Sequence, residues 1–84
     1  MLKGLVIGNV VSTKKQESLT GSKFLEVRII ENNIETDKYI VAVDSVGAGI
    51  GEEVLVTTGS SARLALRNQF EPVDAVIVGL VDPK

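Results

Sequence analysis

The chain has 84 residues, a net charge of -2, and neither cysteine nor histidine. This length predicts a single domain over residues 1–84, and the charge gives no long-range attraction to nucleic acid or to an anionic membrane surface. The missing residue types exclude thiolate and imidazole metal sites, catalytic triads and disulfide bonds.

Three β-strands are predicted in the first half of the chain. The first runs from Leu2 to Thr13, where Gly4 and Gly8 mark bends or points of close backbone approach. The second, over 23–30, alternates apolar and polar residues, so one of its faces is solvated. A polar turn region over 31–37 then leads into a third strand over 38–43.

Two further strands and one short helix are predicted after residue 50. A strand over 53–58 is followed by the Gly59 turn and by hydroxyl residues able to cap a helix that extends to about Leu66 or Arg67. In the last strand, over 73–81, residues 75–78 are apolar without alternation, as in a strand buried by the core on one face and by a neighbouring subunit on the other. The fold class is therefore all-β, a small five-stranded OB-like antiparallel barrel with one short helix.

The glycine-rich loop between the third and fourth predicted strands is the first candidate site. A phosphate-binding loop needs a helix after its glycines, whereas here Glu52, Glu53 and a strand follow, which does not favour anion binding. The Gly-Glu-Glu-Val sequence is instead typical of a turn into a barrel strand, and the small residues before it would allow several copies of the loop to crowd around a symmetry axis. The candidate subunit-interface or pore residues are Gly47, Ala48, Gly49, Gly51 and Glu52.

The segment after the fourth strand is the second candidate site and comprises Ser60, Ser61, Ala62 and Arg63. The serines lack a neighbouring base, so helix capping explains them better than nucleophilic catalysis. Arg63 is either a solvated charge or a contact to another chain.

No catalytic, cofactor or metal site is predicted. Asp44, Glu52 and Glu53 are better explained as turn and rim carboxylates than as an acid/base set, because no histidine or metal motif accompanies them.

Aliphatic residues dominate the apolar content of the chain, since hydrophobic residues make up 44% of it and aromatic residues only 4%. A domain of this size buries only about 60 to 65% of its unfolded surface, so this excess predicts contact with other subunits. No apolar run reaches the ~20 residues of a membrane span, and no signal-peptide pattern is present, so we expect a cytoplasmic protein without a membrane partner.

An OB-fold nucleic-acid-binding module is the main alternative. Three lysines flank one loop, but such modules use aromatic side chains for base stacking, and this chain has few of them. The residues concerned are Lys14, Lys15 and Lys23, with Phe24, Tyr39 and Phe70 as the aromatic side chains. A chaperonin-cap-like ring protein is a third interpretation, but the long mobile loop that would dock a partner is not found.

Motifs along nearly the whole chain resemble the EutN/CcmL family, the pentameric vertex proteins of bacterial microcompartment shells, including carboxysomes. The matching stretches include Gly4-x-Val6-x-Gly8-x-Val10, Ser18-Leu19-x-Gly21-x-Lys23-Phe24-Leu25-x-Val27, Val41-Ala42-Val43-Asp44-Ser45-Val46-Gly47-Ala48-Gly49-x-Gly51-Glu52, Gly59-Ser60-Ser61-Ala62-Arg63, and Pro72-Val73-Asp74-Ala75-x-Ile77-Val78-Gly79. The resemblance implies a homopentamer that caps icosahedral vertices among hexameric shell proteins and closes the shell. It implies a structural protein in the cytoplasm, with no enzyme activity, cofactor or nucleic-acid partner.

Overall fold

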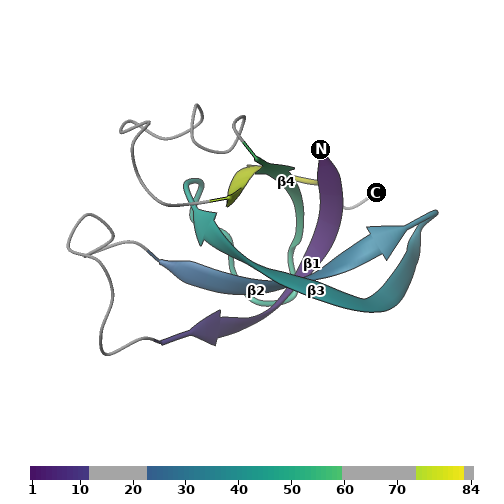
Figure 1. Cartoon of the computed structure of the whole chain (residues 1–84), viewed down its shortest axis with the longest axis horizontal. Helices are drawn as coiled ribbons and strands as arrows, with labels where there is room; N and C mark the ends of the chain where they lie inside the picture. Colours follow the sequence, from purple (N-terminus) through teal and green to yellow (C-terminus); the bar gives the residue numbers. More distant parts are fainter. Residues whose placement is uncertain (12–22, 60–73, 83–84) are drawn as a thin grey trace.

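Five strands form the part of the protein that the computed structural model describes, residues 1–11, 23–59 and 74–82. They are β1 (Leu2–Val10), β2 (Phe24–Glu31), β3 (Ile34–Asp44), β4 (Glu53–Thr58) and β5 (Ala75–Leu80). The strands close into a barrel in the order β1-β2-β3-β5-β4 (Figure 1). Every neighbouring pair is antiparallel except β3 and β5, which run parallel. The predicted all-β barrel is confirmed, and the predicted short helix lies outside the described residues.

The barrel interior is filled by aliphatic side chains from all five strands. On β2 the alternation expected from the sequence is observed, because Leu25, Val27 and Ile29 are buried while the residues between them are half-buried. This is the pattern of a strand with one face on the core. The main core consists of Val6, Leu25, Val27, Ala42, Ala48, Val54, Val56, Ala75 and Ile77.

Strand β5 is buried on both faces over its first three residues. Ile77 belongs to the main core, whereas Val76 packs on the outside of the barrel with Val43, flanked by Phe24 and Val78. Burial of both faces is therefore confirmed for these residues within one chain. Burial against a neighbouring subunit stays a prediction.

Close backbone approach at Gly4 is confirmed. A Cβ at this position would overlap Cγ1 of Val27 and lie 2.9 Å from the carbonyl oxygen of Arg28. Gly8 lies at an irregularity in the pairing of β1 with β2 and has open space where a Cβ would be. Of these two glycines, Gly4 is therefore the one that the packing of the barrel wall requires.

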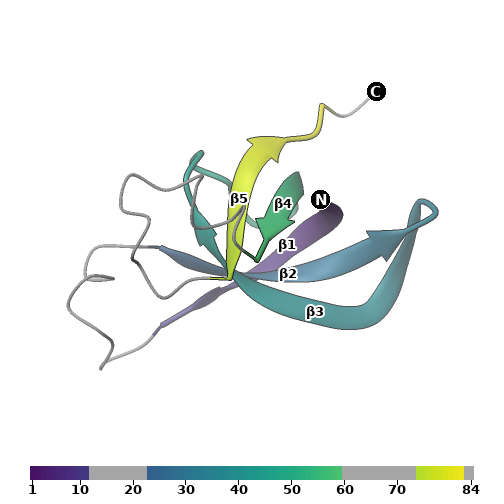
Figure 2. The ribbon, with the colours of Figure 1, turned by 45° about the horizontal axis from the view of Figure 1, so that its top comes forward.

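The hairpin of β2 and β3 projects well beyond the barrel (Figures 1 and 2). Its turn is made by Asn32 and Asn33, both in the left-handed region with φ of 52° and 62°. Two such residues match the twist of a tight hairpin turn. The prediction of a polar turn over 31–37 was wrong, because β3 begins at Ile34 rather than at Lys38. The polar residues belong to a solvated arm of the sheet.

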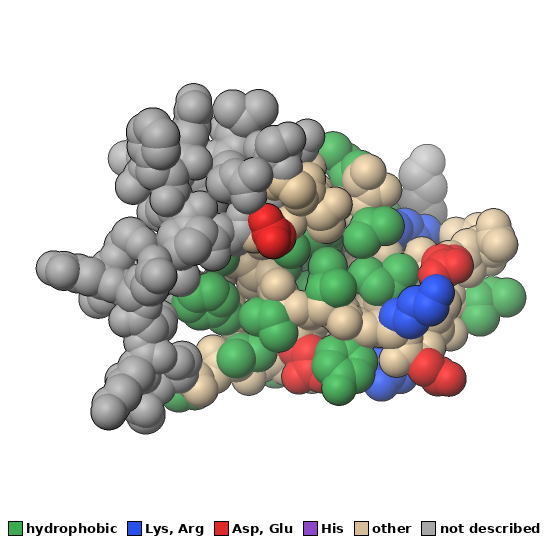
Figure 3. All heavy atoms as spheres, viewed as in Figure 1, with side chains coloured by type: hydrophobic (Ala, Val, Ile, Leu, Met, Phe, Trp, Pro, Cys, Tyr) green, Lys and Arg blue, Asp and Glu red, His purple; other side chains and the backbone are tan. Residues whose placement is uncertain are grey.

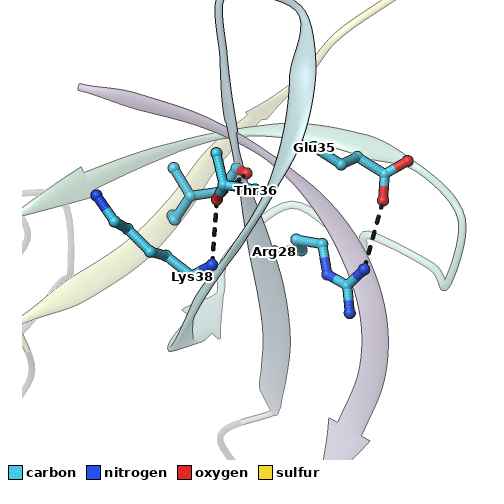
Figure 4. Close-up of polar contacts among 5 residues, drawn as sticks. Arg28, Glu35, Thr36 and Lys38 are labelled. Carbon is cyan, nitrogen blue, oxygen red and sulfur yellow. Dashed lines mark hydrogen bonds and ion pairs between the residues drawn. The ribbon is translucent and has the colours of Figure 1, made fainter.

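A threonine hydroxyl holds the arm together where the register of β2 and β3 shifts, between Arg28 and Ile30. The Thr36 hydroxyl donates to the carbonyl oxygen of Ile29 at 2.8 Å and accepts from the N–H of Lys38 at 3.2 Å (Figure 4). The hydroxyl thus replaces ladder bonds that the irregularity interrupts. The ion pair of Arg28 with Glu35, at 3.9 Å, is solvent-exposed and contributes little to stability.

Candidate functional site

The glycine-rich loop joins the end of β3 to the start of β4. Gly47 and Gly51 have φ of 80° and 90°, a region that side-chain-bearing residues rarely adopt, so the backbone requires glycine at both positions. Gly49 does not have a positive φ, and a Cβ there would lie 3.3 Å from Oε1 of Glu52. The first and third glycines therefore shape the loop, whereas the second is not needed for its conformation.

Asp44 organises the first half of the loop through its carboxylate. Oδ1 accepts from the N–H groups of Val46 and Gly47, both at 3.1 Å, and Oδ2 accepts from the N–H of Ala48 at 3.0 Å. An aspartate that bonds backbone groups just ahead of it is the usual device for fixing such a turn. This carboxylate is a structural acceptor.

Glu52 and Glu53 have similar structural roles. Oε1 of Glu52 accepts from the N–H of Gly49 at 2.7 Å, and Glu53 forms an ion pair with Lys3 at 3.8 Å. The N–H groups of the loop that a phosphate would need, those of residues 46–49, thus already donate hydrogen bonds to the loop's own carboxylates. Within the described residues, no three carboxylates gather as a metal ion would require.

The loop is anchored to the barrel at two points. Ala48 is fully buried in the main core, and its carbonyl oxygen accepts from Nζ of Lys23 at 3.2 Å. Further along, the N–H of Gly51 donates to the carbonyl oxygen of Val6 at 2.8 Å, and the N–H of Val6 donates to Glu52 at 3.0 Å. The loop is therefore a fixed part of the barrel wall rather than a free flap.

The predicted interface residues differ in accessibility. Gly47, Gly51 and Glu52 are exposed, Gly49 is half-buried and Ala48 is inside the core. Val46 and Ile50 are also exposed, although the sequence interpretation had not singled them out. The surface that the loop offers is thus made of backbone and aliphatic groups, with Glu52 at its edge.

The second candidate site, Ser60 to Arg63, lies outside the described residues, as do Lys14 and Lys15. The adjoining Gly59 has φ of 67° and donates its N–H to the carbonyl oxygen of Asp74 at 2.9 Å, which joins the end of β4 to the start of β5.

Sequence reasoning did not single out Val41, and it considered Tyr39 only as an aromatic side chain for base stacking. Both side chains are exposed on the outer side of β3, where they are 59% and 48% accessible. The signal was present, because residues 39–43 form an uncharged apolar run like the one that marked β5.

The fold and the loop together define a small five-stranded β-barrel protein whose candidate site consists of backbone and apolar groups. A family model described as "Ethanolamine utilisation protein EutN/carboxysome" matches residues 1–82. The chain belongs to the EutN/CcmL family. Within the described residues there is no helix long and apolar enough to cross a membrane.

Several relatives are similar over nearly the full chain. The bacterial microcompartment shell vertex protein GrpN of Rhodospirillum rubrum (strain F11) is 51% identical over 83 residues, which cover 98% of this chain and 93% of that protein. The shell vertex protein EutN of Salmonella typhimurium (strain LT2) is 42% identical over 83 residues, 98% of this chain and 84% of that protein.

Solved structures share the fold. Gloeobacter violaceus CcmL has a TM-score of 0.93 at 43% identity, covering 98% of this chain and 86% of that one. The GrpN pentameric microcompartment shell protein from Rhodospirillum rubrum has a TM-score of 0.89 at 48% identity, and the match covers 99% of this chain and 95% of that one.

Proposed function

We propose that this protein is a structural component of a bacterial microcompartment shell, in which five copies form a ring that caps an icosahedral vertex. The observation that carries the proposal is the likeness to the pentameric shell protein GrpN, which spans 99% of this chain and 95% of that one. Because almost nothing is added or lost between the two chains, the whole of residues 1–84 acts as one vertex domain.

The function is geometric. A head-to-tail contact between identical subunits closes into a ring when its rotation divides the circle, and a ring of five among hexagonal tiles forces a flat layer to curve. The neighbours are hexameric shell proteins of the same compartment, and the protein resides in the shell within the cytoplasm. This role requires no catalysis, and the ordered carboxylates of the glycine loop support its backbone.

Shell assembly with and without the chain tests this function. Hexameric shell proteins of one microcompartment are expressed alone and together with this protein, and the particles are imaged by electron microscopy. Closed polyhedral shells are expected only when this protein is present. Closed shells without it, or its absence from purified shells, would contradict the vertex role.

The glycine loop contributes to a subunit interface or lies near the ring axis, since its exposed surface carries small and apolar residues. Gly49→Val is the sharpest probe, because the φ of Gly49 does not require glycine; its Cβ would lie 3.3 Å from Oε1 of Glu52, so that side chain must shift slightly. We expect a folded chain that no longer forms a pentamer in native mass spectrometry. A normal pentamer would leave the loop with a structural role only.

Arg63 lies in the second proposed contact, which acts within the ring or toward a neighbouring hexamer. Arg63→Ala should weaken either the pentamer or shell closure. If both remain intact, Ser60 to Arg63 serve only to cap a helix.

A further inference from the structure

One edge of strand β3 is covered by none of the described strands along most of its length. On one side it pairs with β2 from Ile34 to Val43. On the other side its only partner among the described strands is β5, which it meets at Val43 and Asp44. The edge from residue 34 to residue 42 is therefore unpaired within the part of the chain that the structure describes.

The hydrogen-bond pattern identifies which backbone groups this edge presents. The N–H of Asp44 donates to the carbonyl oxygen of Lys23 at 2.9 Å, which makes these two residues a hydrogen-bonded pair. Bonded and non-bonded pairs alternate along an antiparallel ladder. The register continues without a shift to the pairs Val41↔Glu26 and Tyr39↔Arg28.

Tyr39 and Val41 both occupy non-bonded pairs by this count. Their N–H and C=O groups consequently point away from β2, toward the unpaired edge. Val43 has the same orientation, and it is the residue that β5 pairs with through Val76. Tyr39 and Val41 thus continue a row of backbone groups that β5 satisfies only at its end.

The side chains beside this edge are apolar and accessible. Tyr39 is 59% and Val41 48% exposed, and no charge occurs between Tyr39 and Val43. Figure 3 shows hydrophobic side chains gathered over the middle of this face, with the charged ones mostly toward the hairpin end. An uncharged segment of an edge strand that is rich in β-branched residues, here residues 39–43, is a template for strand addition and an aggregation hazard unless it is covered.

A hollow of about 380 Å³ lies beside the edge, where β3 and β5 separate. Its described lining includes the apolar Ile40, Val41, Val43 and Ala75, together with the polar Thr58 and Asp74. A partner that pairs with the edge could therefore place an apolar side chain in this hollow.

We propose that a second copy of this chain covers the edge and outer face of β3 at Tyr39 and Val41, a surface termed here the β3 strip. The proposal rests on the proposed ring of five. In a head-to-tail ring, each subunit uses two different surfaces, and one surface contacts the other surface of the next subunit. The β3 strip therefore needs a complementary surface elsewhere on the same chain.

The side of the barrel that bears the glycine loop fits this requirement. The loop starts at the end of β3, but Gly51 is bonded to Val6 of β1, which is not a neighbour of β3 in the barrel, so the second half of the loop lies on the β1 side. Ile50 is 63% exposed there. The β3 strip of one subunit receives the Ile50 side of the next, and apolar groups are buried from both.

Hydrogen exchange on the unmodified protein provides the first test. In the ring, the amides of Tyr39 and Val41 are expected to exchange slowly, although none of the described strands of their own chain covers them. Exchange as fast as that at the Asn32–Asn33 turn would overturn the proposal. Protection that arises only when hexameric shell proteins are added would assign the strip to a hexamer instead.

Matched lysine substitutions provide the second test. Val41→Lys places a charge in the strip and should reduce the solution mass to that of one subunit, with an unchanged circular dichroism spectrum. Ile34→Lys, an exposed apolar residue at the far end of the same strand, should remain a ring. A ring in both variants overturns the proposal.

Cross-linking tests whether the β3 strip of one subunit contacts the Ile50 side of the next. The chain has no cysteine, so Val41→Cys combined with Ile50→Cys gives an unambiguous pair. A short bismaleimide should link successive subunits into a ladder, and the control pair Ile34→Cys with Ile50→Cys should not. A ring without the ladder would overturn the assignment of the Ile50 side. A wild-type chain that is monomeric would overturn the ring and this proposal together, whereas a ring with an unprotected β3 strip would overturn this proposal alone.

Discussion

Removal of the Asp44 carboxylate should destabilise the glycine loop more than any other single side-chain truncation in it. Asp44→Ala deletes the acceptor of three backbone N–H groups at 3.0 to 3.1 Å. Two of them, on Val46 and Gly47, are exposed and can bond water, so each costs about 0.5 kcal/mol. The N–H of Ala48 is partly buried and costs about 1 to 3 kcal/mol when unpaired.

The expected loss is therefore about 2 to 4 kcal/mol in the free energy of unfolding. For a domain of this size, each kcal/mol lowers the melting temperature by about 4 to 8 °C. Asp44→Asn should have an intermediate effect, because either orientation of its amide turns an NH₂ toward at least one backbone donor. Urea unfolding at a fixed subunit concentration measures the difference, and hydrogen exchange locates it at residues 46–48.

Asp37→Ala is the matched control. Asp37 is an exposed carboxylate on the hairpin that makes no hydrogen bond or ion pair through its side chain with the described part of the chain. If Asp44→Ala unfolds at the same urea concentration as this control, and its loop amides exchange at the wild-type rate, then Asp44 does not organise the loop.

Three further substitutions probe the barrel, the arm and the loop. Gly4→Ala should cost about 1 to 3 kcal/mol because its methyl group collides with Val27 and the backbone of Arg28. Gly8→Ala should leave stability nearly unchanged, because a Cβ there has open space. Equal denaturation midpoints for Gly4→Ala and Gly8→Ala would refute the close approach at Gly4. Thr36→Val should cost about 1 kcal/mol and speed exchange of the Lys38 amide; an unchanged exchange rate would contradict the bridging role. Gly51→Ala should lower the free energy of unfolding by about 1 to 2 kcal/mol because the φ of Gly51 is 90°. Thermal melts of this variant and of Gly49→Ala would measure the difference.

The barrel was predictable because its signals are local. Strand β2 alternates cleanly, and the continuous apolar run of β5 indicated burial on both faces. The early start of β3 was missed, because both faces of the arm are solvated and its polar residues resemble a loop. The parallel pairing of β3 with β5 depends on residues that are more than 30 positions apart, and no local pattern encodes that.

The candidate site was only partly predictable for the same reason. The sequence indicated that Asp44 is a turn carboxylate, but it did not distinguish Gly47 and Gly51, which have positive φ, from Gly49, which does not. The burial of Ala48 depends on how the loop packs against the barrel. The unpaired edge of β3 became visible only when the partners of every strand were known, because a strand's own sequence does not show whether its second edge is covered.

The solution mass of the purified protein, measured by light scattering over a range of concentrations, tests the ring most directly. A mass near five times that of the 8.9-kDa chain is expected, and it should persist on dilution. A stable monomer would contradict the ring, and with it the vertex role and the covering of the β3 strip.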